Sequence, residues 1–145
     1  MRSPAPLVDR ASAALPGPPD AAGVAPGRIN VIGEHTDYIG GLALPAAVDR
    51  YCVVALARRT DGQVRVRAVD LDETFEWTLG EPPAPTAGWA RLMAGSVEVF
   101  REAVGLDTGF DAAVVGDVPR GGGMSSSAAL CVAWMVALEA LTGAT

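Results

Sequence analysis

Three consecutive glycines, followed within two residues by three serines, restrict the fold more than any other feature of this sequence. The segment before them, residues 110–118, has the apolar character of a strand. The segment after them is rich in Ala and Leu up to Leu141, is apolar on nearly all sides, and ends at the stop signal Gly143, which predicts a buried helix. The pattern therefore predicts a strand, a glycine-rich loop and a helix start at one place.

This glycine-rich loop, residues 119–129, has the composition of an anion site. Glycines let the backbone approach a ligand closely, and the first N–H groups of a helix have no partner within the helix. Together with the helix dipole they can bind phosphate without a lysine. The serine hydroxyls can cap the helix, and they can also reach phosphate oxygens or Mg²⁺. An ordinary glycine-rich turn with a serine N-cap remains the alternative interpretation at this point.

A second motif, residues 25–38, crowds five strongly polar side chains between apolar stretches and glycines: Arg28, Asn30, Glu34, His35 and Asp37. Alternation along an extended chain places Arg28 and Asn30 on the same side. Carboxylates accept hydrogen bonds from sugar hydroxyls, and an arginine can neutralise a transferring phosphoryl group. The motif suits a polyhydroxylated ligand. A solvated turn with an Arg28–Asp37 ion pair is the simpler alternative, and a hydrolytic pair of Glu34 and Asp37 is a weaker one.

The order of the predicted elements indicates an α+β fold rather than a regular alternation of strands and helices. We expect a loose leader or short helix over residues 1–20, broken by prolines, and one domain over residues 21–145. Asp61-Gly62 is expected to turn a β-hairpin. The predicted strands cover residues 24–32, 42–58, 63–71, 74–79 and 110–118, and a helix covers 89–104 before the stop signal Gly105.

Composition excludes several classes of function. The 145 residues carry 17 acidic and 11 basic side chains, and every base is arginine. A net charge of −6 argues against nucleic-acid binding, and the lack of lysine excludes a Walker-type P-loop and Schiff-base chemistry. Cys52 and Cys131 are expected to be reduced thiols in apolar surroundings, without the spacing of a zinc site. There is no apolar core of a signal peptide, and the longest apolar run, residues 128–138, is too short to span a bilayer. We expect a soluble, cytoplasmic protein.

Both motifs resemble those of a known family. Residues 27–38 closely resemble the sugar-binding motif of galactokinases, and residues 119–129 look like the second motif of the GHMP small-molecule kinases, to which galactokinases belong. Gly109-Phe110-Asp111 and Gly116-Asp117-Val118 also resemble the strand before that loop. The resemblance runs from about Gly23 to the end of the chain. The departures are mild: Ile39 replaces a usual Asn, Met124 a usual Leu, and Leu92 a frequent Tyr.

The resemblance implies a GHMP-kinase-type N-terminal domain with a mixed sheet packed against helices. It implies transfer of the ATP γ-phosphoryl group to the anomeric hydroxyl of galactose, with Mg²⁺ as cofactor and no obligate protein partner. Arg28 would be catalytic, and Glu34, His35, Thr36 and Asp37 would hold the sugar. Ser127, or failing that Ser126, would bind the metal. The residues that would bind ATP are Gly121, Gly122, Gly123, Met124, Ser125, Ser126 and Ser127.

Galactokinases are much longer than this chain, and the family's catalytic Asp and acidic magnesium ligand lie beyond the matching segments. We therefore expect these residues alone to be an inactive fragment of a parent enzyme. Two alternatives to galactokinase activity remain: a GHMP kinase for another sugar, and a non-catalytic sensor of galactose and ATP. The intact serines of the loop favour the enzyme.

Overall fold

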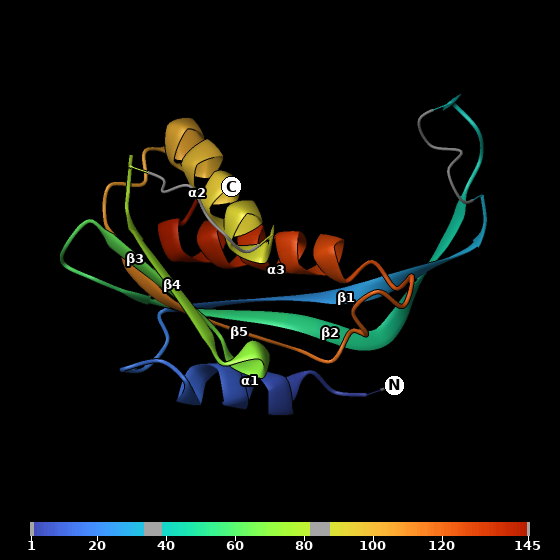
Figure 1. Cartoon of the computed structure of the whole chain (residues 1–145), viewed down its shortest axis with the longest axis horizontal. Helices are drawn as coiled ribbons and strands as arrows, with labels where there is room; N and C mark the ends of the chain where they lie inside the picture. The colour runs from blue at the N-terminus through green and yellow to red at the C-terminus, as the bar shows by residue number, and fades with distance from the viewer. Residues whose placement is uncertain (1, 34–38, 82–87, 145) are drawn as a thin grey trace.

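A five-stranded mixed sheet forms the centre of the molecule, with helices on both faces (Figure 1). The computed structural model describes residues 2–33, 39–81 and 88–144. Helix α1 lies on one face of the sheet, and helices α2 and α3 lie on the other. This arrangement confirms the expected α+β fold. The elements are α1 (Ala5–Ala13), β1 (Ala21–Ile32), β2 (Leu44–Arg58), β3 (Gln63–Ala68), the 3-10 turn η2 (Val69–Leu71), β4 (Glu73–Thr78), α2 (Gly88–Val104), β5 (Phe110–Gly116) and α3 (Ser126–Thr142).

Strand β5 occupies the middle of the sheet, whose order is β1-β2-β5-β3-β4. It pairs antiparallel with β2 and parallel with β3. Residues 110–113 of β5 are all buried, as expected for a strand covered on both faces. The strand that leads into the glycine-rich loop is therefore held by neighbours on both sides.

The prediction that Asp61-Gly62 turns a β-hairpin is wrong, because β5 lies between β2 and β3 in the sheet. The connection from β2 to β3 instead closes around the start of β5. The Gly109 N–H donates to the Asp61 carbonyl oxygen (2.7 Å), and the Arg59 N–H donates to the Gly109 carbonyl oxygen (3.0 Å). A side chain at Gly109 would collide with the Gln63 carbonyl oxygen. The true hairpin is β3–β4, and β3 shows the expected alternation of buried and exposed residues.

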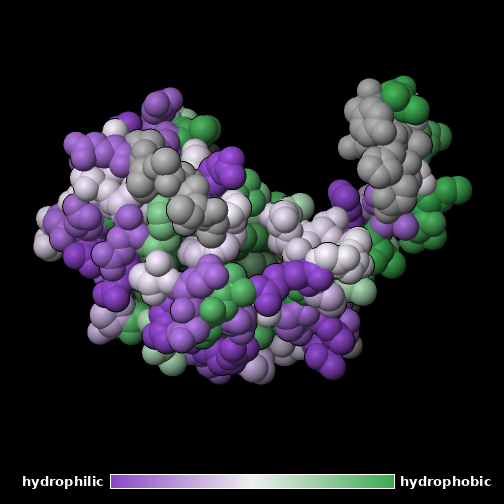
Figure 2. All heavy atoms as spheres, in the orientation of Figure 1, coloured by the Kyte–Doolittle hydropathy of each residue, from purple (hydrophilic) through white to green (hydrophobic). Residues whose placement is uncertain are grey.

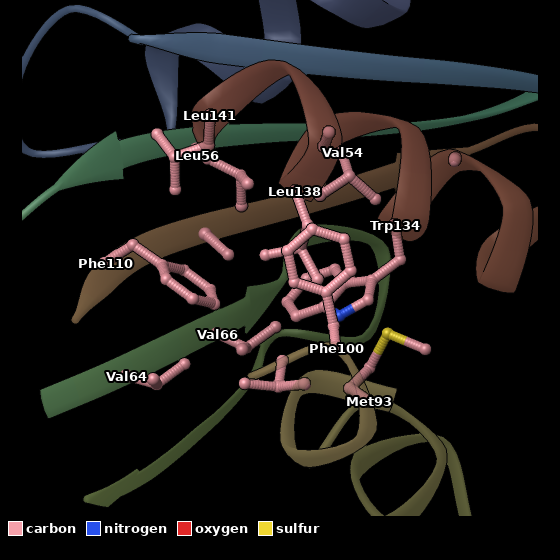
Figure 3. Close-up of a cluster of buried hydrophobic side chains, with 14 of the residues drawn as sticks. Val54, Leu56, Val64, Val66, Met93, Phe100, Phe110, Trp134, Leu138 and Leu141 are labelled. Carbon is pink, nitrogen blue, oxygen red and sulfur yellow. The ribbon is translucent and has the colours of Figure 1, made fainter. Parts of the chain in front are cut away.

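The main hydrophobic core lies between the sheet and helices α2 and α3 (Figure 3). The indole of Trp134 on α3 meets the ring of Phe110 on β5 edge-on, with centroids 6.0 Å apart. Helix α3 buries one face, yet Val132 and Val136 on its other side are exposed, so the helix is less enclosed than its composition predicts. No helix in the described residues is long and apolar enough to cross a membrane.

Helix α1 forms within the segment expected as a loose leader or short helix. Ala11 is fully buried and packs with Val53, Ala55, Ala113 and Val115 on the second face of the sheet. The helix ends at Ala13, ahead of the prolines that cannot continue it. The expected domain boundary at residue 20 stays a prediction, with α1 packed on the sheet that follows it.

Helices α2 and α3 both end at the predicted glycines. Gly105 and Gly143 have φ of 78° and 72°, which is the left-handed conformation that favours glycine. Their N–H groups each donate to a carbonyl four residues earlier, at Arg101 and Glu139. These stop signals are local, and the sequence predicts them correctly.

Strand β1 and helix α3 touch through their backbones at Gly23. A Cβ there would collide with the Ala133 carbonyl oxygen and lie 2.6 Å from the Ala137 nitrogen. We predict that Gly23→Ala lowers the free energy of unfolding by at least about 2 kcal/mol, because the added methyl group has no room. Urea unfolding followed by circular dichroism measures this change.

Gly17→Ala is the matched control, since nothing lies within 4 Å of a Cβ at that position. It should change the stability by less than about 0.5 kcal/mol. Equal stability of the two variants would show that β1 and α3 do not approach as described.

Candidate functional site

The described start of the polar motif, residues 25–33, contacts the glycine-rich loop in the structure. The Arg28 N–H on β1 donates to the carbonyl oxygen of Met124 in the glycine-rich loop, at 3.1 Å. The neighbouring Gly27 is buried, and a Cβ there would lie 2.9 Å from Val118 Cγ1 and 3.0 Å from the Met124 oxygen. The absence of a side chain at Gly27 therefore allows β1 to contact the loop directly.

The loop itself contains three left-handed residues at alternate positions. Gly121, Gly123 and Ser125 have φ of 71°, 69° and 54°. Alternation between right- and left-handed conformations turns successive N–H groups toward one side, which forms an anion-binding concavity. A left-handed serine is uncommon, and such backbone strain is concentrated at functional sites. The conformation of the loop thus fits the predicted phosphate site.

The start of α3 adds further N–H donors beside this loop. The first helical hydrogen bond runs from the Ala129 N–H to the Ser125 carbonyl oxygen, so the preceding N–H groups of the first turn have no acceptor within the helix. Ser125 occupies the N-cap position in a left-handed conformation, and its side chain makes no capping hydrogen bond, so the alternative interpretation of an ordinary serine N-cap does not describe this turn. Helix capping therefore does not use the Ser125 hydroxyl.

A cavity of about 230 Å³ opens beside the start of α3. Helix α2 contributes Trp89 and helix α3 contributes Leu130, and the two serines at the start of α3 also line it. The Trp89 indole N–H donates to a Glu73 carboxylate oxygen on β4 at 2.6 Å, which fixes the indole at the wall. The full lining is Cys52, Ala68, Asp70, Leu71, Trp89, Val114, Gly116, Val118, Arg120, Ser126, Ser127 and Leu130.

This combination of surfaces has a definite chemistry. A mostly apolar cavity suits a flat aromatic group, and the adjacent loop and helix start suit a negatively charged one. The sequence alone did not identify the cavity, because its walls come from six separate elements. Trp89 and Leu130 gave a signal only as members of the two predicted helices, and Asp70 gave none.

The residues expected to bind sugar, Glu34, His35, Thr36 and Asp37, lie outside the described residues. Arg28 and Asn30 lie on β1 where its pairing with β2 shifts register after Pro26 and again after Asn30. Beyond this point the end of β1 and the start of β2 project from the body as an arm with exposed apolar side chains (Figure 2). The described apolar residues of this arm are Val31, Ile32, Ile39, Leu42 and Leu44.

A magnesium site was expected at Ser127. In the described part of the chain no three His, Cys, Asp or Glu side chains lie close enough together to hold a metal ion. The Ser126 and Ser127 side chains do line the cavity. Mg²⁺ keeps several waters and takes most of its remaining ligands from substrate phosphates, so one hydroxyl is a chemically suitable protein ligand. The residues present fit the ion in that limited sense.

Both cysteines are free thiols, as the sequence predicts. Burial, together with the nearby Asp70 carboxylate, raises the pKa of Cys52 to about 12. Burial also raises the pKa of the half-buried Cys131. Cys52 therefore lines the cavity as a neutral, apolar group at physiological pH.

Two family models match the chain. One, described as the galactokinase galactose-binding signature, matches residues 14–58, and one described as the GHMP kinases N terminal domain matches residues 91–145. The galactokinase of Roseiflexus sp. (strain RS-1) is 45% identical over 109 residues, which are 75% of this chain and 28% of that relative. These matches cover both motifs and confirm the resemblance seen in them.

Solved structures agree with these matches. The crystal structure of Lactococcus lactis galactokinase complexed with galactose has a TM-score of 0.75 and 32% identity, over 85% of this chain and 33% of that chain. The Methanococcus jannaschii mevalonate kinase has a TM-score of 0.71 at 17% identity, over 84% of this chain and 39% of that one, and shows a shared fold alone. This chain spans about a third or less of the length of the two galactokinases.

The thiol of Cys52 provides a test of the cavity by pH. In a Cys131→Ser variant, alkylation by iodoacetamide should rise about tenfold per pH unit from pH 7.5 to 9.5, because only the thiolate reacts and its fraction is far from saturation. Mass spectrometry follows the reaction, and circular dichroism confirms the fold at each pH. A rate that levels off by pH 9 would contradict the buried position of Cys52.

Proposed function

The chain belongs to the galactokinase family of GHMP kinases, whose N-terminal portion it matches, and we propose on this basis that its protein phosphorylates galactose with ATP. The anomeric hydroxyl oxygen attacks the γ-phosphorus as its proton passes to a general base of the complete protein, the bond from the γ-phosphorus to the β,γ-bridging oxygen breaks, and galactose 1-phosphate and ADP are formed. The observation that carries the proposal is the contact between Arg28 and Met124, which joins the sugar motif to the phosphate loop.

The nucleotide would bind at the loop and the cavity. The backbone N–H groups of residues 121–127 would surround the phosphates, since the three left-handed residues and the helix start present donors there. The adenine ring suits the apolar cavity next to the Trp89 indole. Both subsites share the serines at the start of α3, so base and phosphates can be bound at once.

Mg²⁺ bound to the ATP phosphates would neutralise part of their charge. The Ser127 hydroxyl is the proposed protein ligand, with Ser126 as the alternative, because both side chains line the cavity at the start of α3. The helix dipole at this end favours the phosphates and not the cation, so the ion would be held by the phosphates together with the serine hydroxyl.

Arg28 is the proposed catalytic residue of this chain. Its backbone is fixed against the loop, so its side chain extends from the border between the two subsites. A guanidinium group there would stabilise the negative charge on the transferring phosphoryl group, and such a contact is typically worth about 3–4 kcal/mol. The sugar hydroxyls are proposed to be held by Glu34, His35, Thr36 and Asp37, as the resemblance to the galactokinase sugar-binding motif implies.

We also propose a cytoplasmic location. ATP is the phosphoryl donor of the proposed reaction, and the two cysteines are free thiols, as is usual in a reducing compartment.

The proposal is tested with the complete gene product, ATP, Mg²⁺ and a panel of sugars, with ADP release as the signal. Galactose should give the highest kcat/KM, because a site that hydrogen-bonds each hydroxyl rejects epimers strongly. Preference for another sugar in the panel would replace galactose as the substrate. ATP binding without turnover of any sugar would favour a sensor and contradict the kinase.

Asp37→Ala should lower kcat/KM for galactose by at least about a hundredfold, because the sugar hydroxyls that Asp37 is proposed to bind would lose their hydrogen-bond acceptor. The affinity for ATP, measured by calorimetry, should stay within about twofold, because Asp37 belongs to the sugar motif and not to the phosphate loop. Asp9→Ala on α1 is the matched control and should leave both values unchanged. Near-normal turnover of galactose by Asp37→Ala would remove Asp37 from the sugar site.

A further inference from the structure

Asp70 lies on η2, the turn between β3 and β4, and lines the cavity proposed for the nucleotide. It makes two contacts, one from each carboxylate oxygen. Oδ2 accepts a hydrogen bond from the Gly116 N–H at 2.8 Å, and Oδ1 accepts one from the Arg10 guanidinium of α1 at 2.7 Å. The side chain therefore connects the last residue of β5 to a helix on the far face of the sheet.

The contact with Gly116 replaces a missing strand partner. The parallel pairing of β3 with β5 ends at Ala68 and Val114. The Gly116 N–H, two residues after Val114, points to the β3 side of β5. At this position β3 has already ended and the chain has turned into η2. A backbone donor left unpaired beside a partly buried cavity would cost free energy. The Asp70 carboxylate extends the hydrogen bonding of the sheet by one donor.

The end of β5 is also hydrogen-bonded on its other side, to β2. The Asp117 N–H donates to the Tyr51 carbonyl oxygen at 3.0 Å, and the Asp117 carboxylate accepts the Tyr51 N–H at 2.7 Å. Gly116 is thus held by Asp70 of η2, and Asp117 is held by Tyr51 of β2. The phosphate loop begins at this point, so its first residues have a defined starting position.

We propose that Asp70 is a positioning residue for the nucleotide, which fixes the base of the phosphate loop through the Gly116 N–H. The proposal rests on the proposed function. A displacement of the loop base would move the N–H groups of residues 121–127 relative to the phosphates, and binding through several convergent donors is sensitive to such shifts. Arg10 offsets the negative charge of Asp70, which would otherwise repel the phosphates.

Three substitutions of Asp70 separate the effect of its negative charge from the effect of the position of the oxygen that accepts the Gly116 N–H. Asp70→Asn keeps an oxygen at the same place for the Gly116 N–H, Asp70→Glu keeps the charge but displaces it by one methylene group, and Asp70→Ala removes both. Glu76→Ala is the matched control, because Glu76 forms a similar exposed ion pair with Arg65 at 2.9 Å, on the β3–β4 hairpin away from the loop.

The experiment measures KM for ATP, KM for galactose and kcat in the complete gene product. Asp70→Ala and Asp70→Glu should raise KM for ATP at least about fivefold and leave KM for galactose within about twofold, because only the phosphate site moves. Asp70→Asn and Glu76→Ala should stay within about twofold of the unaltered protein for both substrates. A merely structural role would lower kcat through a smaller folded fraction and leave both KM values unchanged.

An unchanged KM for ATP in Asp70→Ala overturns the proposal, and so does an equal rise in Asp70→Asn and Asp70→Ala. If Asp70→Ala does not fold, Asp70→Glu against Asp70→Asn decides the same question. Galactose turnover and calorimetric titration with ATP alone together separate failure of the proposed function from failure of the role of Asp70. Absence of galactose turnover in the unaltered protein refutes the proposed function, whereas ATP affinities that are equal in the unaltered protein and in Asp70→Glu refute the role of Asp70.

Discussion

The hydrogen bond from the Arg28 N–H to the Met124 carbonyl oxygen joins two segments that are far apart in the sequence. It forms because Gly27 lets β1 approach the loop without a side chain between them. Without this contact the sugar motif and the phosphate loop would be two separate surfaces. With it, the Arg28 side chain starts from the border between the proposed sugar and phosphate subsites, where a transferring phosphoryl group needs stabilisation.

The sheet and α3 hold this contact in place. Helix α3 lies against β1 at Gly23, so the helix that starts at the loop packs on the strand that carries Arg28. At the other end, Asp70 and Asp117 fix the residues from which the loop departs. The glycine-rich loop thus runs between two fixed points, which combines close approach to a ligand with a defined position.

Local signals in the sequence predicted much of this fold, and non-local ones were missed. The helix stops at Gly105 and Gly143 and the alternation of β3 were predicted correctly, because each depends on neighbouring residues alone. The hairpin at Asp61-Gly62 was wrong, since the order of strands depends on β5, which follows much later in the chain. The sequence left an ordinary serine N-cap open as an alternative, and it could not show that Ser125 adopts a left-handed conformation without a side-chain cap. The cavity could not be predicted, since its walls meet only after folding, and the sugar residues 34–37 stay a prediction from resemblance.

If contact between β1 and the glycine-rich loop makes one site of the two motifs, Gly27→Ala should disrupt that site. A Cβ at this position must push against Val118 and the Met124 carbonyl oxygen. In the complete gene product, kcat/KM for galactose phosphorylation should fall at least about tenfold, with the circular dichroism spectrum unchanged, because small displacements of reacting groups are costly. A folded Gly27→Ala variant with kcat/KM within about twofold of the unaltered protein would show that the contact between β1 and the loop does not form the site.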